Sequence, residues 1–85
     1  MAVLRLFAAA RVAAGTGREI VAGSTVGEVL AAADLRFGPE FTEVARHCAV
    51  WRNGVAATPD ELVEPDDEVA LLPPVSGGAV GRTAG

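Results

Sequence analysis

Short stretches in which apolar residues alternate with polar or small ones predict that most of this chain folds as strands. In the first stretch, Leu4 and Leu6 fall on one side of an extended chain and Arg5 and Phe7 on the other. We therefore expect the side that carries Arg5 to be the wetter one. The predicted strands cover residues 3–8, 18–22, 49–52, 55–57 and 69–72.

Residues 26–37 have a different, helical spacing of apolar side chains. Thr25 and Glu28 match a capping box, in which the threonine oxygen accepts a backbone N–H and the glutamate reaches back. Gly38-Pro39 predicts the end of this helix, with the glycine as a left-handed cap. A short second helix is expected around Phe41.

The segments between these elements contain typical turn residues. Residues 9–17 predict a turn region closed by Gly15-Thr16-Gly17, and Asn53-Gly54 predicts a type I′ turn. Leu62 is expected to point inward from a loop. The resulting order, β-β-α-β-β-β, predicts an α+β domain in which one main helix packs on a mixed sheet. A parallel central pair formed by the first and last strands would make it a β-grasp (ubiquitin-like) fold.

Alternation also predicts which large side chains lie on the sheet face without the helix. If the leucines and valines at positions 4, 6, 50, 69 and 71 face the helix, then Phe7, Trp51 and Leu72 lie on the opposite face. Apolar side chains exposed together on a small domain often form a binding surface, and tryptophan is a frequent hot-spot residue. We therefore assign Phe7, Trp51, Val55 and Leu72 to partner binding.

The last predicted strand leads into a narrow C-terminal segment. Pro73 and Pro74 cannot donate hydrogen bonds to a sheet, and consecutive prolines favour an extended conformation. Val75, Ser76, Gly77 and Gly78 continue this segment with ever smaller side chains. We expect a folded domain over residues 1–76 and a flexible tail over 77–85, whose double glycine could enter a narrow channel.

The segment Asp-Glu-Val-Ala-Leu-Leu-Pro-Pro-Val-Ser-Gly-Gly, residues 67–78, closely resembles the C-terminus of the small subunit of molybdopterin synthase, a ubiquitin-like sulfur carrier. Less specific matches to the same family occur in the family's order along the chain, at Leu6-Phe7-Ala8, Thr25–Leu30 and Asn53-Gly54-Val55. The resemblance implies a β-grasp fold and a carrier without enzymatic activity or a cofactor of its own. It also implies that the Gly78 carboxylate is adenylated and then converted to a thiocarboxylate.

The resemblance implies the partners too. An E1-like adenylating enzyme would use ATP and a sulfur donor, and a molybdopterin synthase large subunit would accept the sulfur. In that family the double glycine ends the chain, whereas residues 79–85 follow it here. Three interpretations stay open: a peptidase, such as a metallopeptidase, removes those residues; Gly85 is used instead; or the carrier chemistry is lost.

Composition narrows the range of functions. A net charge of −4 argues against nucleic acid and anionic membrane as partners and favours a basic groove on a protein. Residues 1–4 are too short for a secretory or membrane segment, and the single cysteine, Cys48, predicts a cytoplasmic protein. His47 and Cys48 alone are too few ligands for zinc, so no metal site is expected.

We assign no catalytic role to two sets of charged residues. Arg11 and Arg18 bracket the first hairpin. Six carboxylates before the last strand predict a solvated edge that steers a basic partner: Asp60, Glu61, Glu64, Asp66, Asp67 and Glu68. Two alternative functions remain, namely a sulfur carrier for thiamine, cysteine, thio-tRNA or a secondary metabolite, and an interaction module that carries no sulfur.

Overall fold

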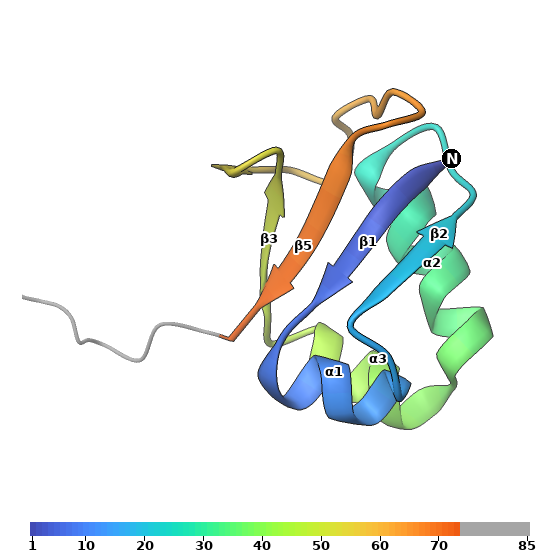
Figure 1. Ribbon diagram of the computed structural model, residues 1–85, viewed down its shortest axis with the longest axis vertical. Coiled ribbons are helices and arrows are strands. Elements are labelled where there is room, and N and C mark those ends of the chain that lie inside the picture. Colours follow the sequence, from blue (N-terminus) through green and yellow to red (C-terminus); the bar gives the residue numbers. More distant parts are fainter. Residues whose placement is uncertain (74–85) are drawn as a thin grey trace, which may run out of the picture.

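The centre of the fold is a parallel pair of strands that joins the two ends of the described chain. A computed structural model describes residues 1–73, and Figure 1 shows its sheet in front of helix α2, with helices α1 and α3 across the lower end. The elements are β1 (Ala2–Leu6), α1 (Ala8–Ala14), β2 (Arg18–Val21), α2 (Val26–Phe37), α3 (Pro39–Ala45), β3 (Ala49–Arg52), β4 (Val55–Ala56) and β5 (Glu68–Leu72).

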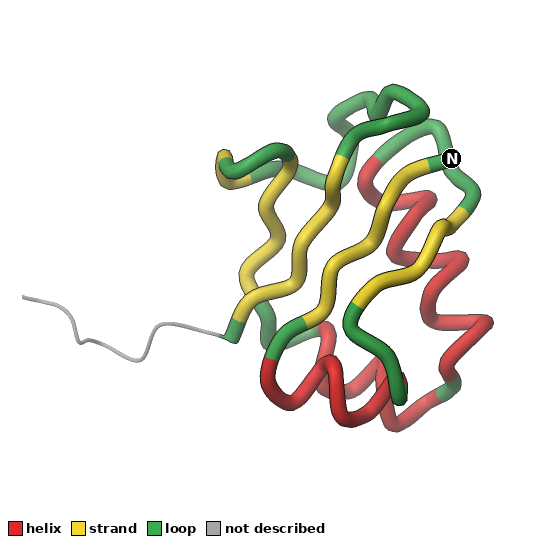
Figure 2. The backbone as a smooth tube through the Cα atoms, in the orientation of Figure 1, coloured by secondary structure: helices red, strands yellow, loops and turns green. Residues whose placement is uncertain are grey.

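Within residues 1–73 the strands form one five-stranded sheet in the order β2-β1-β5-β3-β4 (Figure 2). β1 and β5 pair in parallel, while the other neighbouring strands pair antiparallel. The mixed sheet, the parallel central pair and the helix packed against it confirm the predicted β-grasp fold. The predicted boundary between a domain and a tail at residues 76–77 lies outside the described residues.

The core lies between the sheet and the helices. Leu4 and Leu6 on β1, and Val69 and Leu71 on β5, are completely or almost completely buried. From the helices, the core receives Ala10, Val26, Val29, Ala33 and Phe41. The alternation predicted for β1 and β5 is therefore confirmed, and Val50 also packs against this core, although it is only partly buried.

Helix α2 begins as the sequence predicts. The Thr25 Oγ1 atom accepts a hydrogen bond from the Glu28 N–H at 3.1 Å, and the Glu28 carboxylate accepts one from the Ser24 N–H at 2.7 Å. The helix ends at Gly38, but with φ 94° and ψ −179°. This conformation favours glycine, although it is not the left-handed helical one that was expected.

Residues 9–17 were predicted to be a turn region, and this prediction was wrong. They contain α1, which the structure stabilises by burying Ala10 completely. Alanine is the strongest helix former, but a helix this short needs tertiary packing, which no local pattern reveals. Phe7 at its N-cap provides no side-chain hydrogen bond, so the usual start signal is missing as well. Gly15 ends the helix with φ 78°.

The prediction that Leu62 points inward was also wrong, because its side chain is 69% exposed. Leu62 forms an isolated β-bridge with Thr25, and the Val63 N–H donates to the Ser24 carbonyl at 3.0 Å. The extended backbone at this bridge turns the next residue, Val63, toward the core. The Asn53-Gly54 turn is confirmed, since both residues have the positive φ that a type I′ turn requires.

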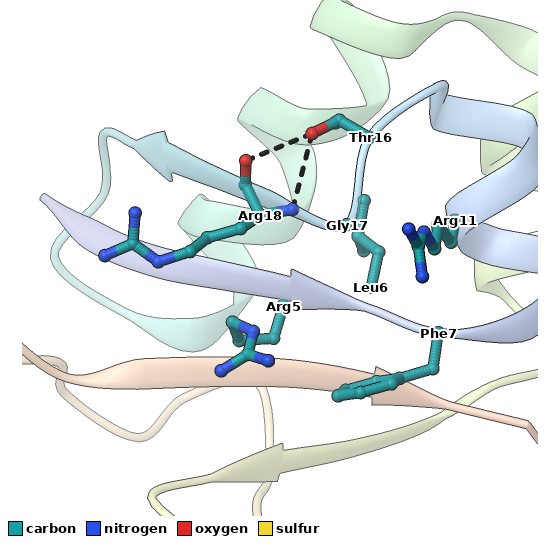
Figure 3. A pocket seen from close by; sticks show the side chains of 7 residues that line it. All are labelled: Arg5, Leu6, Phe7, Arg11, Thr16, Gly17 and Arg18. Atoms are coloured by element: carbon teal, nitrogen blue, oxygen red, sulfur yellow. Dashed lines mark hydrogen bonds between the residues drawn. The ribbon is translucent and has the colours of Figure 1, made fainter.

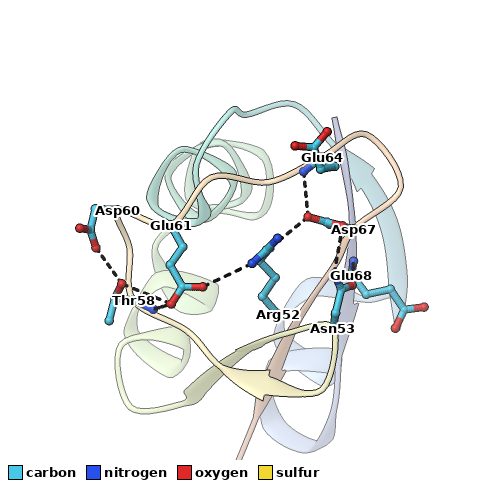
Figure 4. Close-up of polar contacts among 8 residues, drawn as sticks. All are labelled: Arg52, Asn53, Thr58, Asp60, Glu61, Glu64, Asp67 and Glu68. Carbon is cyan, nitrogen blue, oxygen red and sulfur yellow. Dashed lines mark hydrogen bonds and ion pairs between the residues drawn. The ribbon is translucent and has the colours of Figure 1, made fainter.

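The carboxylates before β5 do more than form a solvated edge. Asp67 accepts hydrogen bonds from the Arg52 Nε at 3.0 Å, the Asn53 Nδ2 at 3.0 Å and the Glu64 N–H at 2.8 Å (Figure 4). Arg52 also pairs with Glu61 at 3.6 Å. The backbone N–H of Glu64, together with Asn53 and Arg52, lowers the Asp67 pKa to about 2. Asp67 thus fastens the loop before β5 to the β3–β4 turn.

This network predicts how stability depends on acid. Because the pKa of Asp67 is about 2 in the folded chain and 3.8 ordinarily, its contribution is fully present above pH 3.8 and is lost as pH falls toward 2. At neutral pH we expect Asp67→Asn to unfold at a lower urea concentration than the wild type. The difference between the two urea midpoints should narrow as the pH falls from 3.8 toward 2. Urea unfolding followed by Trp51 fluorescence measures both effects.

Asp66→Asn serves as the control, because Asp66 is exposed and takes no part in these hydrogen bonds. The difference in urea midpoint between Asp66→Asn and the wild type should stay small and constant between about pH 5 and about pH 2. If the gap between the wild type and Asp67→Asn were equally constant, the proposed role of Asp67 would be refuted.

Candidate functional site

The helix-free face of the sheet carries the apolar residues predicted for partner binding. Trp51 on β3 lies opposite Ala70 on β5, and Leu72 lies opposite Ala49. Trp51 and Leu72 are half-buried, and Phe7, just after β1, is 37% exposed. We call Phe7, Trp51, Ala70 and Leu72 the sheet patch. Three of the four predicted partner-binding residues thus lie on one face, as the alternation indicated.

Val55, the fourth predicted residue, is not part of this patch. It pairs with Arg52, whereas Ala56 pairs with Trp51. Directly opposed residues of paired strands share a face, so Val55 belongs to the other side of the sheet from Trp51. Its side chain is 67% exposed at the edge of the sheet. The alternation argument placed Phe7, Trp51 and Leu72 on one face but did not determine the face of Val55.

The C-terminal segment leaves the sheet beside this patch. Leu6 and Leu71 are partners in the parallel pair, so Phe7 and Leu72 follow at the same end of the two strands. Pro73, the last described residue, is exposed there. The predicted tail residues Pro74, Val75, Ser76 and Gly77 and the predicted reactive residue Gly78 lie outside the described residues.

A basic hollow, which the sequence analysis missed, adjoins the patch. Arg5, Arg11 and Arg18 surround a pocket of about 370 Å³ together with Leu6, Phe7, Thr16 and Gly17 (Figure 3). Arg5 and Arg18 are opposed across β1 and β2, while Arg11 comes from α1. We call these three side chains the arginine cluster. Strand alternation separates Arg5 from the buried leucines, but bringing Arg18 and Arg11 beside it requires the β1–β2 register and helix α1.

His47 and Cys48 form no reactive site. The Cys48 thiol donates to the Val44 carbonyl at 3.5 Å, and burial raises its pKa, which keeps it protonated. The exposed His47 ring lies 3.4 Å from the Glu43 carboxylate. Among the described residues, no three histidine, cysteine or acidic side chains gather as metal ligands. No helix in this part of the chain has the length and apolar character needed to cross a bilayer.

The sheet patch generates a test of partner binding. We expect Trp51→Ala and Leu72→Ala each to weaken binding to a partner protein by about 2 kcal/mol, the usual cost of losing an apolar anchor. Leu35→Ala is the matched control, because Leu35 is 89% exposed on α2, away from the patch. Calorimetric titration measures affinity, and circular dichroism verifies folding. Unchanged affinity in both patch variants would rule out the patch as the docking surface.

Comparison with known proteins agrees with this geometry. The ThiS family model matches residues 4–78. The crystal structure of SAMP1 from Haloferax volcanii is similar at 38% identity and a TM-score of 0.72, covering 91% of this chain and 98% of that one. The small archaeal modifier protein 1 from Methanosarcina acetivorans has 27% identity and a TM-score of 0.81, covering 91% and 95%.

The Amycolatopsis orientalis BexX/CysO complex contains a chain with the same fold, at 19% identity and a TM-score of 0.75, with 92% of this chain and 100% of that chain covered. The family match spans most of the sequence and includes both the sheet patch and the segment after β5. The protein therefore belongs to the ThiS family of ubiquitin-like sulfur carriers, which work with partner enzymes.

Proposed function

We propose that this chain carries sulfur on the carboxylate of Gly78, after residues 79–85 have been removed, and donates it in molybdopterin biosynthesis. The observation that carries the proposal is that the family match ends at Gly78, although the sequence continues. This match supports the double glycine as the functional end of the domain. The resemblance of residues 67–78 to the molybdopterin synthase small subunit supports this pathway.

The chemistry requires a free carboxylate. While Gly78 is bonded to Ala79, its carbonyl belongs to an amide and cannot be adenylated. Hydrolysis of that bond by a peptidase frees the acid. The Gly78 carboxylate then attacks the α-phosphate of ATP and pyrophosphate leaves. A sulfur nucleophile from the donor attacks the acyl carbon, the new C–S bond forms, and the C–O bond to AMP breaks.

The carrier's part is delivery rather than catalysis. β5 ends at Leu72 beside the sheet patch, so a partner that docks on the patch lies next to the point from which the chain continues toward Gly78. The adenylating enzyme and then a molybdopterin synthase large subunit supply the acid, the base and the positioning groups. In this proposal the chain is not an enzyme and has no cofactor of its own. The ATP that the adenylating enzyme requires supports a cytoplasmic location for the activation step.

The likeness to SAMP1 favours a second candidate function. That protein is described as a modifier, and this chain is 38% identical to one example. In a modifier, the activated Gly78 acyl group is transferred to an amine of another protein instead of being exchanged for sulfur. Activation is common to both functions, and the fate of the acyl group distinguishes them.

Mass spectrometry tests the proposal directly. Chains 1–85 and 1–78 are incubated with the adenylating enzyme, ATP and a sulfur donor. We expect only chain 1–78 to gain the mass difference of one oxygen replaced by sulfur, because only it has a Gly78 carboxylate. Omitting ATP should abolish the change.

Conversion of chain 1–85 to the same extent would contradict the requirement for trimming. If chain 1–78 were activated but gave an amide with an added amine in place of the thiocarboxylate, the modifier function would be supported. Failure of chain 1–78 to react at all would overturn both candidates.

A further inference from the structure

We propose that the arginine cluster of Arg5, Arg11 and Arg18 binds carboxylates of an acidic segment on the partner protein, and so sets the direction in which the tail enters that partner. This inference deepens the proposed function, on which its role in tail delivery rests. The binding chemistry of the cluster can be tested separately.

The three arginines line the same hollow from different elements. Arg5 on β1 and Arg18 on β2 are directly opposed in the antiparallel pair. Arg11 lies near Gly17, where an added Cβ would come within 3.3 Å of its Nε. Figure 3 shows Arg11 approaching the hollow from α1, while Arg5 and Arg18 extend from the strands. Opposed like charges destabilise a sheet, so this arrangement favours an incoming anion.

Most of the hydrogen-bonding capacity of the cluster is unused within residues 1–73. Arg11 and Arg18 form no ion pair with any described acidic residue. Arg5 pairs with Glu68 at 3.5 Å, but its enclosed Nε has no hydrogen-bond partner there. Residues 74–85 contain no aspartate or glutamate. An arginine can bind a carboxylate through two parallel hydrogen bonds, so the cluster can hold more than one carboxylate.

The charge near the tail is opposite to that of the whole chain. Residues 1–18 contain these three arginines and no acidic residue, whereas residues 58–68 contain six acidic residues and no basic one. The acidic loop precedes β5, whereas Arg11 and Arg18 lie toward the end of the sheet where β5 finishes (Figure 1), and Arg5 reaches back to Glu68 at the start of β5. The net charge of −4 suggested a basic partner, but a partner at the tail faces positive charge.

The surroundings favour protein carboxylates over phosphates. The Arg5 guanidinium lies 5.6 Å from the centre of the Phe7 ring, so the cluster continues into the sheet patch. An apolar surface with a charged rim is typical of protein interfaces. The Leu6 N–H and the Thr16 hydroxyl are already hydrogen-bonded to backbone carbonyls, which removes donors that a phosphate would use. The net negative charge also disfavours nucleic acid.

Binding to the adenylating enzyme tests the role of the cluster. In calorimetric titrations with chain 1–78, we expect Arg11→Gln/Arg18→Gln to weaken binding by about tenfold or more, and the loss to shrink at high ionic strength. The control is Arg46→Gln, which removes one positive charge, as do the single variants Arg11→Gln and Arg18→Gln. Arg46 caps the C-terminus of α3, is 65% exposed and, among residues 1–73, forms an ion pair with Glu43 alone. Its variant should therefore bind within about twofold of the wild type.

A double variant that binds as tightly as the wild type would overturn the proposed role. So would an equal loss in Arg46→Gln, because the effect would then reflect net charge. If the wild-type chain neither binds nor is adenylated, the proposed function fails, and the peptide titration below still decides the binding chemistry.

The chemistry of the cluster is tested without any partner. Hexaglutamate, hexaglutamine, inorganic phosphate and oligothymidine are titrated into chain 1–78, and the Nε–H signals of Arg11, Arg18 and Arg46 are followed by NMR. We expect hexaglutamate alone to shift the Arg11 and Arg18 signals at low ionic strength, with Arg46 unchanged. Tighter binding of phosphate or oligothymidine, or no shift with hexaglutamate, would overturn the proposal.

Discussion

The parallel pairing of β1 and β5 is the constraint on which the rest of the molecule depends. It brings residues near the start of the chain, such as Val3 and Leu6, beside residues 65 positions later. The side chains of Leu4, Leu6, Val69 and Leu71 are buried between the sheet and the helices. Each such side chain contributes about 1.5–3 kcal/mol when fully buried. Because the strands run in the same direction, they also end together, and the tail leaves the sheet next to Phe7.

This arrangement gives the two ends of β5 different tasks. At its start, Asp67 ties the preceding loop to the β3–β4 turn through Arg52 and Asn53. Its other end lies beside the sheet patch, which adjoins the arginine cluster. One strand therefore separates a region of fixed internal charge pairs from a region whose apolar and basic groups are available to another molecule.

The sequence predicted those features that depend on neighbouring residues. The capping box at Thr25, the turn at Asn53-Gly54 and the alternation in β1 and β5 are all local patterns, and the structure confirms them. Features that depend on tertiary contacts were missed. Helix α1 forms because Ala10 is buried against distant elements, and Leu62 is exposed because a bridge to Thr25 turns the chain.

In the candidate site, too, the features set by local sequence patterns were predicted and those set by tertiary contacts were missed. Phe7, Trp51 and Leu72 could be placed on one face because strand alternation is local, whereas Val55 requires the register of β4 with β3. The arginine cluster could not be predicted, since it needs both the β1–β2 register and the helix that carries Arg11. The net charge of −4 gave no indication of this basic cluster, because acidic residues elsewhere outnumber the arginines.

The central claim is that Gly78 becomes the end of the working protein. Intact-mass measurement of the protein purified from its native cells tests this most directly. The account predicts a species that ends at Gly78, part of it with one oxygen replaced by sulfur. A population that consists only of chains retaining residues 79–85 would contradict it.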